Sequence, residues 1–346
     1  MFNGRLTITP EFYWNTTRDM LYETVIPITS GYSRQVQNIG QVTNKGFELT
    51  VNGTIVQKKD FNLSANLTFG LNRSKVDKIN GDVDEMWFES PFTGTNDYLM
   101  KVGQPLGVIY GYVYDGLYGF DEFDRTTGAN YEPKVDANGN QIPVNGEAMF
   151  GTLPGKPKYK NIVDHGGGRE DDVNIIDEYD RVKIGDTTPD FTGGIGITAR
   201  WKNFDFTANF NYMVGFDVYN GTAYMLSSSI DNNKNGNYYN VLAKYGHNHR
   251  WNYTNDIGER IYNNSVLPGY NDQYYEPMNR NASVWNPTDV GKKVSSSNFV
   301  EDGSFLRLQD ITIGYTLPER ITRKFGVQRL RVYFTGSNLW LLTGYS

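Results

Sequence analysis

The sequence contains no cysteine and only three histidines among 346 residues. Without thiols, disulfides and thiolate metal sites are excluded, and this absence fits an exported bacterial protein as well as many others. No run of about 18 apolar residues occurs, so the sequence predicts no membrane-spanning helix. The opening "MFNGRLTITP" has neither a basic stretch nor an apolar core, so we expect no signal peptide in this chain. The net charge of −6 argues against a nucleic-acid partner, which would require a basic face.

The residues that are abundant favour β-structure. Aromatic residues make up 14% of the chain, with 25 Tyr and 19 Phe, and there are 37 Gly. Tyr and Phe suit strands, and Gly suits turns. Residues 204–214, "FDFTANFNYMV", alternate almost perfectly between apolar and polar side chains. Such a period of two predicts a strand with one apolar and one polar face.

The same alternation occurs in six further segments: 5–15, 46–56, 61–72, 191–201, 305–317 and 329–338. Together with 204–214, they predict seven strands. A soluble β-sandwich would also alternate, but these segments run to about ten residues, the length that crosses a bilayer when tilted. Short basic connections at 57–60 and 202–203 contrast with long ones at 16–45 and 218–303. This asymmetry is typical of a transmembrane antiparallel β-barrel with long extracellular loops. We therefore expect an all-β fold whose apolar face meets lipid.

The direction of the strands constrains the segment between 73 and 190, which must contain an even number of crossings. Residues 98–102 and 106–114 are candidates for two crossings, but they alternate poorly, so zero crossings stays open. The basic connection 318–328 is predicted to be helical. Trp14, Trp201 and Tyr315 fall near strand ends, where aromatic girdles are expected.

Four stretches of the sequence resemble the SusC-like, TonB-dependent transporters of the Bacteroidota outer membrane, and they occur in the family's order. They are "NIGQVTNKGFELTVNGTI" (38–55), "IGDTTPDFTGGIGITARWKNFDFTANFNYMVGFDVYN" (184–220), "NFVEDGSFLRLQDITIGYTLPERI" (298–321) and "LRVYFTGSNLWLLTGYS" (330–346). The resemblance implies roughly strands 13–21 of a plugged barrel of about 22 strands. Residues 1–346 would then be a partial C-terminal β-barrel domain, a fragment without plug domain, TonB box, early strands or closing strand.

The resemblance also implies a function and partners. A SusD-like outer-membrane lipoprotein would capture an oligosaccharide or a peptide, and TonB–ExbB–ExbD, acting through the absent plug, would open a path for it. Five charged residues of the polar face would point into the lumen, where they could contact plug or substrate: Glu11, Glu48, Arg200, Arg329 and Arg331. We expect no enzyme activity, because no Ser/His or paired-carboxylate arrangement appears.

The long loops combine aromatic and amide side chains, which suits either a sugar-binding surface or a protein contact. Candidate ligand or partner residues are Trp87, Tyr238, Tyr239, Trp251, Tyr274, Tyr275 and Trp285. No cofactor is expected. An acidic loop, however, could hold a structural Ca²⁺ through Asp171, Asp172, Asp177 and Asp180. The alternative hypotheses are a secreted β-rich carbohydrate-binding protein and a barrel enzyme.

Overall fold

The computed structural model describes most of the chain. The described residues are 4–25, 29, 31–32, 34–38, 40–79, 83–91, 93–125, 131–135, 137, 139, 141–142, 144–145, 153–163, 174–229, 240–253, 275–288 and 293–345. No helix among them is long and apolar enough to cross a membrane.

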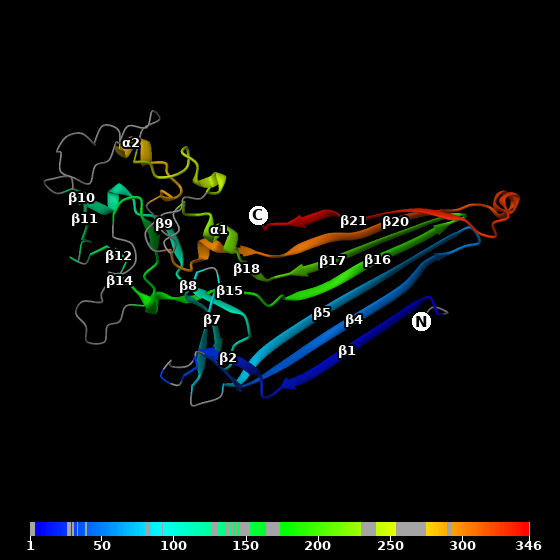
Figure 1. Ribbon diagram of the computed structural model, residues 1–346, viewed down its shortest axis with the longest axis horizontal. Helices are drawn as coiled ribbons and strands as arrows, with labels where there is room; N and C mark the ends of the chain where they lie inside the picture. The colour runs from blue at the N-terminus through cyan, green and yellow to red at the C-terminus, as the bar shows by residue number, and fades with distance from the viewer. Residues whose placement is uncertain are drawn as a thin grey trace.

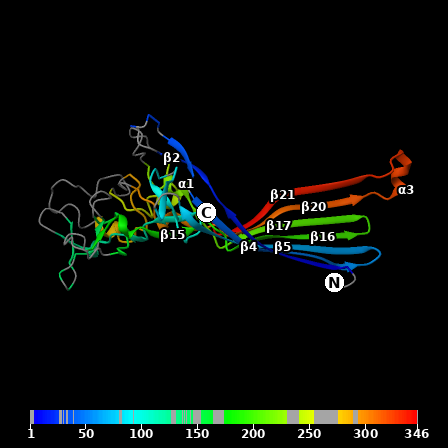
Figure 2. The same cartoon turned by 90° about the horizontal axis from the view of Figure 1, so that it is seen from below.

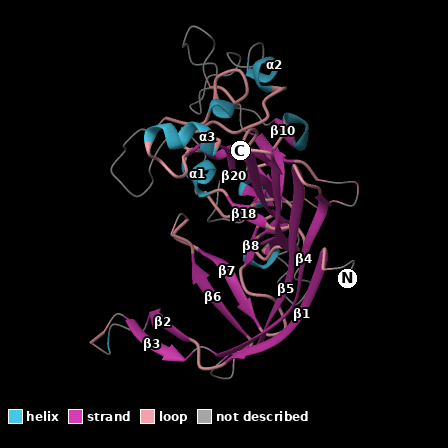
Figure 3. Ribbon diagram, turned by 90° about the vertical axis from the view of Figure 1, so that its right-hand side faces the viewer, coloured by secondary structure: helices cyan, strands magenta, loops and turns pink. Residues whose placement is uncertain are grey.

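One antiparallel sheet of seven strands dominates the molecule, in the order β1-β4-β5-β16-β17-β20-β21 (Figure 1). All seven predicted strands are present, and two of them have the predicted bounds. The strands are β1 (Leu6–Thr17), β4 (Gly40–Gln57), β5 (Phe61–Ile79), β16 (Phe191–Trp201), β17 (Phe204–Val214), β20 (Phe305–Thr316) and β21 (Arg331–Thr343). Seen from the end that carries the short turns, the sheet is an open arc (Figure 3).

β5 pairs directly with β16, so no crossing strand lies between these two in the main sheet. The chain therefore supplies seven strands to this sheet, where the estimate of strands 13–21 counted nine. The two candidate crossings instead lie in β7 (Asn96–Lys101) and β8 (Val108–Gly111), part of a separate sheet with β6 (Glu85–Glu89) and β15 (Val182–Asp186). Consecutive residues of both strands are buried, so both of their faces are covered by protein. A strand between lipid and a polar lumen would bury neither face in this way.

The two ends of the sheet differ greatly. One end carries tight turns at residues 58–60 and 202–203, and a connection that contains α3 (Glu319–Thr322) and η6 (Arg323–Phe325). The helix predicted at 318–328 is thus present. The described parts of the long connections gather at the other end (Figures 1 and 2) and form what we call the cap, the described residues within 18–39, 80–190 and 215–304.

The cap is built from short elements. Besides β6, β7, β8 and β15, the described part contains β2 (Leu21–Val25), β3 (Arg34–Asn38), β9 (Tyr114–Leu117), β10 (Phe123–Arg125), β11 (Tyr131–Pro133), β12 (Val144–Asn145), β13 (Pro157–Tyr159), β14 (Ile175–Ile176), β18 (Asp217–Tyr219), β19 (Val300–Asp302), α1 (Gly221–Met225), α2 (Tyr275–Asn279), η2 (Phe120–Glu122), η3 (Glu178–Asp180), η4 (Ala243–Tyr245) and η5 (Ser297–Phe299).

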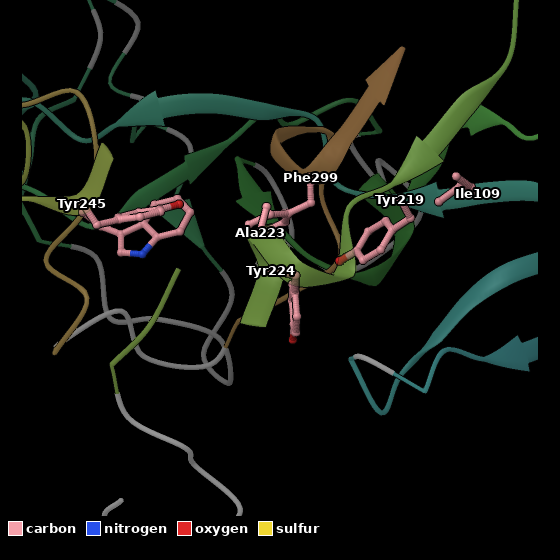
Figure 4. Packing of buried hydrophobic residues seen from close by; sticks show 7 residues of the cluster. Ile109, Tyr219, Ala223, Tyr224, Tyr245 and Phe299 are labelled. Carbon is pink, nitrogen blue, oxygen red and sulfur yellow. The ribbon is translucent and has the colours of Figure 1, made fainter. Parts of the chain in front are cut away.

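Among the described residues, the largest hydrophobic cluster lies in the cap (Figure 4) and comprises Ile109, Tyr219, Ala223, Tyr224, Tyr245, Trp285 and Phe299. The indole Nε1 of Trp285 donates to the carbonyl of Ser227 at 2.9 Å, which satisfies its one polar group. The main sheet, in contrast, leaves large apolar side chains open: Phe12 is 80% exposed and Phe334 67%. The cap thus has a core of its own, whereas the sheet has an uncovered apolar face.

Candidate functional site

The apolar face of the main sheet is continuous across its strands. On β16, Ile195 lies opposite Leu67 of β5 on one side and Phe210 of β17 on the other. Ile195 and Leu67 are each 38% exposed. Soluble monomers rarely expose contiguous apolar surfaces of this extent, and such surfaces mark protein or membrane contacts. Because the apolar side chains alternate with polar ones along strands long enough to span a bilayer, lipid is the partner that fits this face.

Two rows of aromatic rings border this apolar face. In the upper row, near the cap, Phe12, Phe47, Phe69, Phe191 and Tyr212 follow one another with ring centroids 4.8–6.4 Å apart. In the lower row, near the short turns, Phe204 stands 6.1 Å from Trp201 and 4.6 Å from Tyr315. Trp14 lies beyond the upper row, with the Lys45 ammonium 3.7 Å from its ring.

The spacing of the two rows matches a membrane. On β16, Phe191 and Trp201 belong to different rows and are separated by about ten residue steps, or roughly 34 Å of strand. With the strand tilt of about 35–45° that barrels adopt, this distance projects to roughly 24–28 Å along the membrane normal. The apolar band of outer-membrane barrels is about 25 Å tall. The rows are therefore placed as interfacial girdles would be.

A glycine allows one ring of the upper row to reach across the neighbouring strand. The Tyr212 hydroxyl donates to the carbonyl of Thr68 at 3.1 Å, and its ring passes over Gly193 of the strand between them. A Cβ at Gly193 would lie 2.4 Å from the Tyr212 hydroxyl oxygen. The absence of a side chain there is what lets the tyrosine span two strands.

The opposite face is polar and lies on the inside of the arc. At its upper end, Val42 and Val76 of this face pack against Met100 of the cap, and the Ser74 hydroxyl accepts from the Leu106 amide at 3.2 Å. The strands β6 and β7 project on the concave side in Figure 3. Since the cap packs on the polar face, that face is the concave one. In a closed barrel it would line the interior.

An ion pair spans three strands near the lower end of the polar face. The Arg331 Nε of β21 donates to the Asp205 Oδ1 of β17 at 3.0 Å, across Gly314 of β20. A Cβ at Gly314 would lie 2.5 Å from the guanidinium, so glycine provides the room for this contact. Arg200 and Arg329 lie close enough to act electrostatically on the same carboxylate. Three of the five predicted lumen residues are therefore brought together around Asp205.

The two predicted acidic lumen residues are also neighbours. Glu11 and Glu48 are directly opposite each other in the register of β1 and β4, and both are exposed. Like charges at opposing positions destabilise a sheet, so a cation from elsewhere would be favoured beside them. Arg200, in turn, borders a cleft of about 420 Å³ with Lys59, Asn62 and Lys202.

The indoles predicted as loop ligands are packed against other side chains of the cap. Trp251 and Trp285 are only 3% and 2% exposed. Trp285 belongs to the cap core, and Trp251 packs against Phe120 with ring centroids 4.9 Å apart. Trp87 is half-buried between Tyr110, whose ring meets it edge-on at 5.6 Å, and the Arg181 guanidinium, 4.9 Å from its ring. Tyr275 is the first residue of α2, whereas Tyr238, Tyr239 and Tyr274 lie outside the described residues.

The cap contains a cleft of about 540 Å³ that the sequence did not indicate. Phe120 and Trp251 contribute to its apolar wall, and Asp121, Glu276 and Arg280 to its polar rim. Glu276 and Arg280 form an exposed ion pair of 2.7 Å within α2. The volume lies within the range of small-ligand sites. The cleft unites residues 116–121 with residues between 251 and 283, so no local motif could have predicted it.

Two of the four predicted calcium ligands are described, and both carboxylates accept hydrogen bonds from backbone amides. The buried Asp180 accepts from the amides of Ile162 at 2.6 Å, Val163 at 3.0 Å and Asp177 at 2.9 Å. Asp177 caps η3 by accepting from the Tyr179 amide at 2.9 Å. Asp171 and Asp172 fall outside the described residues, within which no group of three or more acidic or histidine side chains is arranged to hold a metal. Calcium binding stays a prediction.

We expect Asp97 of β7 to make the stability of the cap depend on pH. Burial raises the pKa of this 1% exposed carboxyl, although hydrogen bonds from Thr93 and Thr95 and the charge of Arg181, 3.6 Å away, act in the opposite direction. The folded state therefore binds the proton more tightly than the unfolded state, whose pKa is near 3.8. The contribution of Asp97 to stability is then largest at low pH and falls as the pH rises from 3.8 through the raised pKa.

Hydrogen exchange of the β6–β7–β8 amides between pH 3 and 7, corrected for intrinsic exchange rates, would measure this dependence. We expect protection to fall with rising pH in the native chain and the slope to flatten in Asp97→Asn. An equal slope in both would assign the dependence to other groups.

Comparison with known proteins agrees with this geometry. The profile of a family described as "TonB dependent receptor-like, beta-barrel" matches residues 1–156. TonB-dependent receptor P3 of Formosa agariphila is 30% identical over all of this chain and 29% of its own length. TonB-dependent receptor SusC of Bacteroides thetaiotaomicron is 24% identical over 99% of this chain and 27% of its own length. The chain thus spans less than a third of these relatives.

Among solved structures, the RagAB peptide importer in its closed-closed state superposes with a TM-score of 0.63. The match covers 99% of this chain and 31% of that one at 24% identity, and it shows a shared fold. A curved antiparallel sheet with an apolar outer face, a polar inner face and a large cap at one end defines the class of outer-membrane β-barrels. Within that class, the chain is similar to TonB-dependent receptors, SusC among them. These relatives are receptors and transporters.

Proposed function

We propose that this chain forms part of the wall of an outer-membrane, TonB-dependent importer for nutrients. The observation that carries the proposal is the two-faced sheet: an uncovered apolar face between two aromatic rows, backed by a concave polar face with clustered charges. A secreted carbohydrate-binding protein would have to cover that apolar face with a second layer of its own. The seven strands would lie toward the C-terminal end of a larger plugged barrel.

The two charged groups of the polar face would act on whatever passes through or fills the lumen. Glu11 and Glu48 offer an acidic site on β1 and β4, and the Arg200, Arg329 and Arg331 group offers a basic one around Asp205. Lumen charges tune which solutes a barrel accepts. They are equally suited to holding a plug domain, whose movement under force from TonB–ExbB–ExbD would open the path.

The cap would provide the extracellular vestibule and the contact surface for a SusD-like lipoprotein. Its buried aromatic core gives it a defined shape, so its surface can be complementary to a lid. The substrate class is an oligosaccharide or a peptide; a peptide importer is what the structural neighbour RagAB is described as.

Uptake by cells that express the intact transporter, with oligosaccharide and peptide pools offered in parallel, tests the function. We expect uptake of one pool that is lost when TonB is removed. Glu48→Gln and Arg200→Gln should slow this uptake without reducing the amount of barrel in the membrane. Uptake that persists without TonB, or a chain that fractionates away from the outer membrane, would refute the proposal.

A further inference from the structure

The end of the sheet that carries the short turns is basic, although the chain as a whole has a net charge of −6. All three connections at this end contribute: Lys58 and Lys59 in the first, Lys202 in the second, and Arg320, Arg323 and Lys324 in the third. Asp60 and Glu319 are the only acids in these turns. This charge distribution is local, and it faces whatever lies at the lower edge of the apolar band.

The connection between β20 and β21 adds exposed apolar groups to these charges. Phe325 is 77% exposed and Ile321 39%. The two residues are four apart in the helical segment, so they share one side of it, and Arg320 and Lys324 share the adjacent side. Arg323 is paired with Glu319 at 2.8 Å, but Arg320 and Lys324 make no ion pair in the part of the chain that the structure describes. The result is a short amphipathic surface, which we call the α3 anchor (residues 318–327).

The α3 anchor is a defined structure and not a loose loop. The Leu317 amide donates to the Leu330 carbonyl at 2.9 Å, which closes its base. Within the anchor, Thr322 is buried, and the Val327 amide donates to the Thr322 carbonyl at 3.1 Å. Gly326, with φ of +69°, ends the helical segment in the left-handed conformation that glycine adopts without strain. Phe325 is therefore held in its exposed position by the backbone around it.

The height of the anchor matches the edge of the membrane. Tyr315 of the lower aromatic row lies two residues before Leu317, where the connection begins. Figure 2 shows α3 beyond the ends of β20 and β21. Basic amphipathic segments at the level of lipid headgroups bind anionic membrane surfaces, with aromatic side chains in the interface and Lys or Arg near the phosphates.

We infer that the α3 anchor binds anionic phospholipid headgroups of the adjacent leaflet. Phe325 and Ile321 would insert at the boundary between headgroups and acyl chains, with Arg320 and Lys324 beside the phosphates. The inference rests on the proposed placement of the sheet in the outer membrane. It assigns this turn a lipid partner that steadies the β20–β21 hairpin. Charge complementarity selects this occupant over neutral lipid, and the exposed ring selects a membrane over free phosphate.

A nitroxide on a single cysteine measures the depth of each position, and this chain has no cysteine of its own to remove. The intact transporter would be reconstituted in phosphatidylcholine vesicles with or without phosphatidylglycerol. Labels at Phe325→Cys, at Phe334→Cys on the apolar face, and at the exposed Lys160→Cys in the cap would be compared by collision with oxygen and with a water-soluble nickel complex. We expect the ratio of oxygen to nickel collision at Phe325→Cys to exceed that at Lys160→Cys severalfold when anionic lipid is present, and to fall when it is absent.

Charge variants complete the test. Arg320→Ser with Lys324→Ser should abolish the anionic-lipid dependence at Phe325→Cys, whereas Lys160→Ser with Lys244→Ser, an equal loss of charge in the cap, should preserve it. A label at Phe325→Cys that stays water-exposed in both vesicles while Phe334→Cys reports lipid would overturn the inference alone. That result would indicate a periplasmic partner for the turn. If Phe334→Cys is also water-exposed, the membrane placement itself fails.

Discussion

Ile195→Arg is expected to lower the free energy of unfolding of the barrel in lipid by about 2–4 kcal/mol, the cost of an arginine at the bilayer midplane on a lipid-facing strand. Ile195 lies on β16 midway between the two aromatic rows, beside Leu67 and Phe210. The guanidinium of an arginine introduced at this position would be too far from either interface for the side chain to reach water fully. Urea titration of the intact barrel in vesicles, followed by the shift of its unfolding midpoint, measures the effect.

Thr198→Arg is the matched control, because Thr198 lies on the same strand but on the polar face, beside Ser64 and Thr207. Introducing the same side chain there should change the free energy of unfolding by no more than about 0.5 kcal/mol, as for other exposed positions. The comparison isolates the face of the sheet from the chemistry of arginine. Equal penalties at the two positions would contradict the placement of Ile195 in a lipid-facing surface.

The main sheet could be predicted from the sequence because each of its strands has the same environment along its whole length. A strand between lipid and a polar interior alternates along its length, so the period-two signal extends through 191–201 and 204–214, where Met213 is the one apolar residue on the polar face of the second segment. The observed β16 and β17 coincide with those segments. The helical connection after Leu317 was also predictable, since Pro318 and the charged run after it suit the start of a short helix.

The cap could not be predicted in the same way, because its elements are short and its contacts are long-range. β7 and β8 are buried on both faces, so they show no alternation and resemble poor crossing strands. The parity argument allowed zero or two crossings, and only the pairing of β5 with β16 decides between them. The strand count was too high for this reason.

The role of the loop tryptophans could not be read from composition either. An aromatic ring in a polar loop can stack on a ligand or bury itself in a small local core, and both uses give the same residue frequencies. Trp285 follows the second course because Tyr114, Tyr245 and Phe299, from three other segments, surround its ring. A cap of this size needs such a cluster to keep a fixed shape.

Trp285→Ala is expected to destabilise the cap by about 3–5 kcal/mol, the usual cost of truncating a buried large aromatic side chain. The change removes ring contacts to three aromatic neighbours and leaves the Ser227 carbonyl without its indole donor. Hydrogen exchange should accelerate at β18, β19 and α1, which pack in the same cluster, while amides of β16 and β17 keep their protection. Trp87→Ala, which shortens a half-buried ring outside this cluster, should leave exchange at β18 and β19 unchanged.

The same variant separates the two roles that the loop aromatics could have. If Trp285 is structural, Trp285→Ala should weaken capture of a SusD-like lid in proportion to the loss of protection in the cap, because the contact surface loses its fixed shape. If the indole contacted substrate, the variant would lower substrate affinity while hydrogen exchange in the cap stayed as in the native chain. Measuring exchange and lid binding on one preparation decides between them. The burial of the ring and its hydrogen bond to Ser227 favour the first result.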